Sequence, residues 1–139
     1  IDGITDAKVP KFDSPVELRV RAAALYGAPK DAEEIGSYAV LEAARTEGTL
    51  VLWAGDPDEG NTTRETLGPD VVEFVKGEHG KTYQSLFPVA QDGDFLAVLK
   101  ALKDLVLTVR MGTDLPLRIE WESDTSTGVY LLAPRIESD

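Results

Sequence analysis

The sequence has no cysteine and a single histidine, and both shortages narrow the chemistry open to it. Without cysteine there is no disulfide, thiol nucleophile or cysteine metal site, which fits an intracellular protein. The histidine, His79, lies in Glu78-His79-Gly80, a sequence typical of a tight turn, and no second histidine exists to complete a zinc site. No serine stands in a nucleophile-elbow setting, and no glycine-rich phosphate loop occurs. These absences argue against the common enzyme classes.

A calcium loop is also incomplete. The run Asp56-Pro57-Asp58-Glu59-Gly60-Asn61 offers carboxylates, but the twelfth position is Leu67, where a bidentate glutamate would be needed. A solvated hairpin loop is the better interpretation. We therefore predict no catalytic residue, no metal and no cofactor. An α+β hydrolase that uses a pair of buried carboxylates stays open as an alternative, although no pair stands out in the sequence.

Long apolar runs and basic residues are both scarce. No run of 18 uninterrupted apolar residues and no signal peptide occur, so we predict no membrane association. The 14 basic residues face 25 acidic ones, giving a formal net charge of −11. Such a surface repels phosphate on average, which argues against a compact, high-affinity DNA binder. It still allows a protein that surrounds DNA and touches it lightly through one locally basic face.

The 139 residues, 42% of them hydrophobic, are enough for one domain with a substantial core. The chain begins at Ile1, and we expect it to be a piece of something longer. Residues 1–13 have no hydrophobic period and predict an extended connector over the surface. Periodicity then predicts about nine strands and two helices. The strands are expected at 16–20, 38–45, 49–55, 61–67, 71–77, 81–89, 105–111, 117–121 and 129–133, and the helices at 22–35 and from Asp92 or Asp94 to Lys103.

Two features of this pattern bear on architecture. Gly27 and Pro29 predict a kink or restart within the first helix. The order strand, helix, three strands occurs twice, with one extra strand at 71–77 between the two units. We therefore predict an α+β fold of two pseudo-symmetric βαβββ units, with both helices on one face of the sheets.

The end of the chain is its most distinctive part. Five apolar residues run from Val129 to Ala133, and Pro134 then stops the strand because proline donates no backbone hydrogen bond. The segment at 133–137, Ala-Pro-Arg-Ile-Glu, closely resembles the C-terminus of the sliding-clamp family, proliferating cell nuclear antigen (PCNA). Asp-Leu-Pro-Leu-Arg-Ile-Glu-Trp at 114–121 resembles the penultimate strand of that family, and residues 2–13 resemble its interdomain connector.

The resemblance covers nearly the whole chain and implies a DNA-clamp domain. Residues 1–14 would be the interdomain connector loop, and 15–139 the C-terminal domain of a clamp subunit. Together with an N-terminal clamp domain and other subunits, it would form a trimeric ring that encircles double-stranded DNA as a non-catalytic processivity factor for DNA polymerase. A clamp-like adaptor or decoy that binds client peptides without encircling DNA is the alternative. The implied location is intracellular: cytoplasm or nucleoid in an archaeon, nucleus in a eukaryote.

The resemblance also implies three functional surfaces. DNA polymerase, flap nuclease, ligase and clamp loader would dock a peptide containing a glutamine, a spaced aliphatic residue and two aromatics into an apolar pocket formed by Val9, Pro10, Leu115, Pro116, Tyr130, Ala133, Pro134 and Ile136. Weak, sequence-independent DNA contacts would come from Lys30, Lys100, Lys103 and Arg21. The subunit interface would be the threonine-rich edge strand Asn61, Thr62, Thr63, Arg64, Glu65, Thr66 and Leu67, pairing through its backbone.

Overall fold

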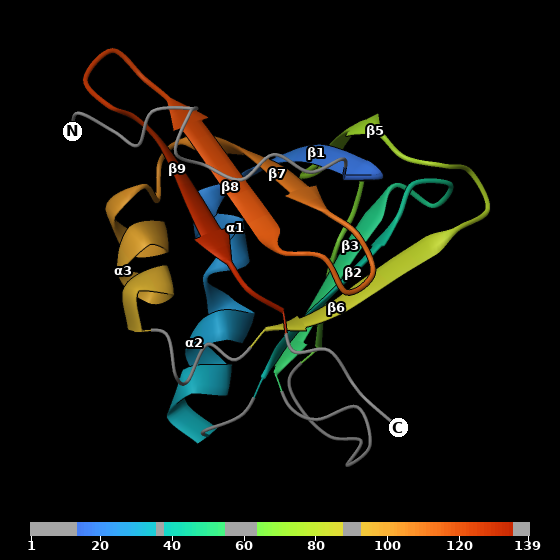
Figure 1. Ribbon diagram of the computed structural model, residues 1–139, viewed down its shortest axis with the longest axis horizontal. Helices are drawn as coiled ribbons and strands as arrows, with labels where there is room; N and C mark the ends of the chain where they lie inside the picture. The colour runs from blue at the N-terminus through green and yellow to red at the C-terminus, as the bar shows by residue number, and fades with distance from the viewer. Residues whose placement is uncertain (1–13, 36–37, 55–63, 88–92, 135–139) are drawn as a thin grey trace.

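The computed structural model describes residues 14–35, 38–54, 64–87 and 93–134. These residues form nine strands and three helices (Figure 1). In chain order the elements are β1 (Val16–Arg21), α1 (Ala22–Leu25), α2 (Gly27–Ile35), β2 (Ala39–Ala44), β3 (Thr49–Ala54), β4 (Arg64–Leu67), β5 (Glu73–Lys76), β6 (Thr82–Phe87), α3 (Gly93–Ala101), β7 (Val106–Met111), β8 (Leu117–Glu122) and β9 (Thr127–Leu132).

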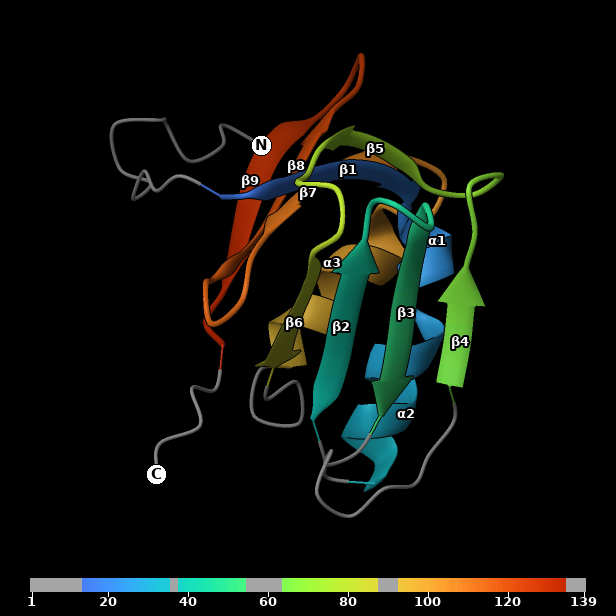
Figure 2. The same ribbon diagram turned by 90° about the vertical axis from the view of Figure 1, so that its right-hand side faces the viewer.

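The strands make two antiparallel sheets. One has the order β5-β1-β7-β8-β9 and the other the order β4-β3-β2-β6. The helices lie on one side of the sheets, with α2 behind β2 and β3 in Figure 2. A single core joins the layers, and Leu18 of β1, Leu52 of β3 and Phe95 of α3 all belong to it. The predicted α+β fold with helices on one face is therefore confirmed.

The predicted internal repeat is present with an exchange of strands. The first unit is β1-α1-α2-β2-β3-β4 and the second is β6-α3-β7-β8-β9. The first strand of each unit pairs with the sheet of the other unit, giving β1-β7-β8-β9 and β6-β2-β3-β4. The extra strand, β5, adds to the free side of β1. As a result, β9 and β4 occupy equivalent edge positions in the two sheets.

The helices follow the sequence with one interruption. The first helical stretch is divided into α1 and α2 at Tyr26, and Pro29 lies in the first turn of α2, where the missing N–H of proline is tolerated. The predicted restart is thus confirmed. In α3, Phe95 and Leu99 are buried, with Leu102 buried just beyond its end, while Lys100 is exposed. This helix therefore presents one apolar face to the core, as its spacing predicts.

Most differences from the predicted strands are at their ends. The strand predicted at 71–77 is shorter: β5 begins at Glu73, and Val71 and Val72 instead close a turn with N–H groups donated to the carbonyl of Gly68. Leu105 precedes β7, and its N–H donates to the carbonyl of Leu102 at 2.8 Å. The N–H groups of both segments are bonded within local turns, so β5 and β7 begin later than side-chain alternation alone predicts.

Candidate functional site

Three of the predicted DNA-facing residues come together on the helix side. Lys30 of α2, Lys100 of α3 and Lys103 line one groove of about 370 Å³, together with Ala23, Tyr26 and Leu99. We call this set the lysine groove. The three lysines are exposed, whereas Leu99 is fully buried beneath them. The sequence places Lys100 and Lys103 one turn apart, and the fold adds Lys30 from a segment about 70 residues earlier.

Backbone hydrogen bonds hold the two sides of the lysine groove together. The N–H of Ala23 donates to the carbonyl of Lys103 at 3.1 Å, and the N–H of Ala22 donates to the carbonyl of Leu105 at 3.0 Å. The N–H of Lys30 donates to the carbonyl of Tyr26 at 3.0 Å across the helix break. Because no carboxylate is among the residues that line it, the groove is locally basic in an acidic protein.

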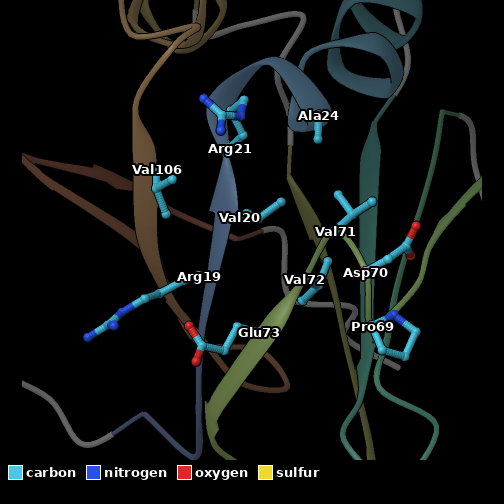
Figure 3. Close-up of a pocket in the computed structure, with 10 residues that line it drawn as sticks. All are labelled: Arg19, Val20, Arg21, Ala24, Pro69, Asp70, Val71, Val72, Glu73 and Val106. Atoms are coloured by element: carbon cyan, nitrogen blue, oxygen red, sulfur yellow. The ribbon is translucent and has the colours of Figure 1, made fainter.

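Arg21 lies elsewhere. It ends β1, and its Nη1 donates a 2.9 Å hydrogen bond to the carbonyl of Asp104. It lines a second pocket, of about 420 Å³, that does not include the three lysines. In Figure 3, Arg21 and Ala24 lie on the β1–α1 side of this pocket, and Val71 and Val72 lie on the segment that leads into β5. The structure therefore does not bring Arg21 into the lysine groove.

The predicted docking residues fall into two neighbouring segments. Because Leu117 at the start of β8 pairs with Leu132 at the end of β9, the preceding Leu115 and Pro116 lie near the following Ala133 and Pro134. Ala133 is exposed, and the side chains of the other three are half-buried, so none is sealed in the core. Three further predicted residues, Val9, Pro10 and Ile136, lie outside the described part of the chain.

Tyr130 is placed differently from the rest of that set. Its ring stacks on Phe95 of α3, with ring centroids 5.9 Å apart and an interplanar angle of 23°. It therefore lies on the helix side of the five-stranded sheet. Since side chains alternate along a strand, Leu131 points to the outer face, where it is half-buried. Leu131 is absent from the predicted docking residues, and strand alternation is the signal that separates it from Tyr130.

The outer face beside Leu131 carries a connected set of charges. Arg118, the registered partner of Leu131, has its Nε 2.6 Å from Oε2 of Glu120. Arg110 bridges from Glu120 to Glu17, with Nε–Oε1 at 3.3 Å and Nη1–Oε1 at 2.7 Å. The set spans β1, β7 and β8. It fixes the long side chains on this face, because each carboxylate has a defined cationic partner.

The predicted subunit-interface strand is an edge strand. β4 pairs on one side with β3, and no strand pairs with its other side among the described residues. Arg64, Glu65 and Thr66 are exposed, whereas Leu67 is buried. The Arg64 guanidinium lies over the ring of Trp53, 4.8 Å from its centroid. Asn61, Thr62 and Thr63 lie outside the described part of the chain.

Two searches of the described residues bear on other classes of site. Within residues 14–35, 38–54, 64–87 and 93–134, no cluster of three or more histidine, aspartate or glutamate side chains could hold a metal ion. In the same part of the chain, no helix is long and apolar enough to cross a membrane.

Comparisons with known proteins give a consistent picture, although no family model matches the sequence. The chain is 30% identical over 135 residues to the DNA polymerase sliding clamp of Methanococcus vannielii, an alignment that covers 96% of this chain and 53% of that protein. The chain thus spans about half the length of the curated relatives that it matches.

Solved structures show the same fold. PCNA from Thermococcus kodakaraensis matches with a TM-score of 0.70 and 24% identity, covering 97% of this chain and 53% of that one. PCNA of A. fulgidus, in a structure where the C-terminal region of FEN-1 is bound to it, matches with a TM-score of 0.72 and 23% identity, covering 95% of this chain and 51% of that one.

Proposed function

Because this chain belongs to the PCNA family of DNA sliding clamps, we propose that it is one domain of a ring that encircles double-stranded DNA. The ring would contain an N-terminal clamp domain and further subunits, and it would keep DNA polymerase on its template by topological linkage. Residues 1–14 would be the connector and 15–139 the C-terminal domain. This mechanism needs no chemical turnover.

The lysine groove is the observation that best supports a DNA-facing role. Lys30, Lys100 and Lys103 gather three positive charges on the helix side of a domain with a net charge of −11. Lysine ammonium groups on flexible stems suit transient contacts with phosphates, which are independent of sequence. The surrounding acidity keeps such contacts weak, as sliding requires.

The proposed DNA contacts are tested by reversing two of these charges. We expect Lys100→Glu/Lys103→Glu, assembled with its partner clamp domains on closed circular DNA, to shorten the retention time on the circle. If each lysine of the groove neutralises one phosphate, each domain contributes a slope of about −2.7 to log affinity against log salt, since each contact contributes about −0.9. Removing two contacts should reduce that slope by about 1.8 per domain.

The matched control is Lys76→Glu/Lys81→Glu, which makes the same change in net charge at β5 and at the turn before β6. We expect this control to retain the wild-type slope. Equal losses in both variants would mean that overall charge, and not the lysine groove, governs DNA contact. Loss of retention with peptide affinity unchanged would support separate surfaces for DNA and for clients.

For the docking function, we propose that client peptides bind where the start of β8 meets the end of β9. Leu115, Pro116, Ala133 and Pro134 provide apolar surface there. DNA polymerase, flap nuclease, ligase and clamp loader are the proposed clients. Titration with a peptide of the client type tests this. Binding of the peptide without retention on circular DNA would favour the adaptor function instead.

Association with a neighbouring clamp domain would use β4. The side of β4 that pairs with no described strand can add a strand by backbone hydrogen bonds, and the exposed polar side chains of β4 keep this edge soluble when it is unpaired. Such a contact joins two different surfaces, so it is heterologous and can close a ring when the rotation between domains allows.

A further inference from the structure

Ser85 is a polar residue on the core side of a strand, where its buried hydroxyl depends on hydrogen bonds within the protein. It lies on β6 and is only 1% exposed. Its neighbours two positions away on the same face, Tyr83 and Phe87, belong to or pack against the hydrophobic core. A buried hydroxyl at such a position must find hydrogen-bond partners to offset its loss of water.

Both partners of Ser85 are in the turn between β7 and β8. Its Oγ donates to the carbonyl of Gly112 at 3.2 Å and accepts the N–H of Asp114 at 3.0 Å. β6 and β7 belong to different sheets, so these two bonds connect the sheets at this point. In Figures 1 and 2 the turn between β7 and β8 reaches toward β6.

The turn adopts a conformation that needs such support. The N–H of Leu115 donates to the carbonyl of Gly112 at 3.3 Å, which closes a four-residue turn. Asp114, its third residue, has φ of 60°, and it is the one non-glycine residue with positive φ in the described part of the chain. Glycine or asparagine usually takes this place in a turn, because other side chains are strained there. The bond from the Asp114 N–H to Ser85 stabilises the conformation directly.

The same turn fixes the first docking residue. A Cβ atom added to Gly112 would come within 2.7 Å of Cδ1 of Leu115 and within 2.7 Å of Cδ of Pro15. The Leu115 side chain and the Pro15 ring are therefore packed directly over the glycine backbone. Pro15 follows the predicted connector, so the turn sets both the position of Leu115 and the point where the chain enters the domain.

We infer that Ser85 is a positioning residue for client binding, because it holds the Gly112–Leu115 turn in the conformation that presents Leu115 to the peptide. This inference rests on the proposed docking function. Ser85 lies inside the core and does not touch the peptide. Its effect is to keep the apolar pocket formed before the peptide arrives, so that binding does not have to order the turn.

The test compares Ser85→Ala with a variant of similar stability loss at a distant site. Leu52→Val removes one buried carbon from β3, in the same sheet but away from the turn. Affinity is measured by calorimetry with the full 139-residue chain and a synthetic peptide that contains the glutamine, the aliphatic residue and the two aromatics. We expect Ser85→Ala to bind about tenfold more weakly, since two hydrogen bonds that order the turn are lost, and Leu52→Val to stay within about twofold.

Two further measurements separate positioning from general stability. Hydrogen exchange at the amides of Asp114 and Leu115 should accelerate in Ser85→Ala and not in Leu52→Val. Adding Asp114→Gly to Ser85→Ala should restore part of the affinity, because glycine adopts positive φ without strain.

The outcomes distinguish the two levels of the argument. If Ser85→Ala binds the peptide as tightly as the wild-type chain does, the positioning role is wrong and the docking function is unaffected. A wild-type chain that does not bind the peptide would overturn the docking function, and the inference with it.

Discussion

Replacing Gly128 by alanine should destabilise the domain through one side chain, Trp121. The two residues are registered partners on β9 and β8. A Cβ atom at Gly128 would lie 2.8 Å from Cε2 and from Cη2 of Trp121, and closer still to Cζ2. Carbon atoms do not approach so closely, so the indole ring must move. Its movement would break the hydrogen bond from Nε1 of Trp121 to Oγ of Ser126, which is 3.1 Å long.

The size of the effect follows from three contributions. Forcing a methyl group into this packed contact costs about 1–3 kcal/mol. Loss of the indole hydrogen bond adds about 1 kcal/mol. The lower flexibility of unfolded alanine relative to glycine offsets about 0.5–1 kcal/mol. The expected net loss in the free energy of unfolding is therefore about 2 kcal/mol. With an unfolding entropy of about 2.1 cal/mol/K per residue over 139 residues, this lowers the Tm by about 7 °C.

The assay is thermal and urea unfolding followed by circular dichroism, with indole fluorescence as a local probe. The chain has two tryptophans, so a Trp53→Phe background isolates the emission of Trp121. The control is Thr127→Ala, one residue earlier on β9 and exposed. If Gly128→Ala unfolds at the same temperature as Thr127→Ala and leaves the emission of Trp121 unchanged, the claim that the ring packs on the glycine backbone is wrong.

Two further predictions concern the two faces of the five-stranded sheet. Arg110→Met removes the shared partner of Glu17 and Glu120, and it should lower the free energy of unfolding by about 1 kcal/mol at low salt. The loss should be smaller at 1 M salt, because the arginine side chain is 37% exposed and salt screens its charge. Urea midpoints at the two salt concentrations measure this, and a loss independent of salt would contradict it. Tyr130→Ala should lower the free energy of unfolding by about 3 kcal/mol, because it removes a ring stacked on Phe95. Leu131→Ala should instead weaken client-peptide binding, with a stability loss below about 1 kcal/mol. Unfolding curves and peptide titrations of both variants measure this, and a reversal of the two effects would contradict it.

The sequence predicted the helices, the strands and their buried faces better than it predicted which strands pair with each other. Alternating residues such as Leu18 and Val20 identify the buried side of β1, because the side-chain period of a strand depends only on local order. They do not identify β7 as its partner, since any strand with a compatible apolar face could pair there. The exchange of first strands between the two units is therefore a result of the structure. It depends on pairings between residues far apart in the sequence, such as Leu18 with Val109, which local periodicity does not encode.

The residues predicted to be functional divide in a similar way: the sequence indicates which residues share a face, and the fold decides which faces meet. Lys100 and Lys103 share a helix face by their spacing, but their meeting with Lys30 depends on how α2 and α3 pack. Arg21 shares their charge, yet β1 carries it to a different pocket. Tyr130 and Leu131 differ by one residue and point to opposite faces, so strand parity, applied to the docking set, separates them. The sequence did not predict the hydrogen bonds from Ser85 to the turn, because they join β6 of one sheet to a turn of the other.

The positions of these surfaces explain how one small domain could serve several partners together. The lysine groove lies among the helices, the proposed docking residues lie where β8 begins and β9 ends, and β4 is the edge of the other sheet. No residue belongs to two of these surfaces. Sites without shared partners contribute to the free energy nearly independently. Under the proposed function, such a domain would remain on DNA and in a ring while its clients exchange, since binding at one surface would not require the others to change.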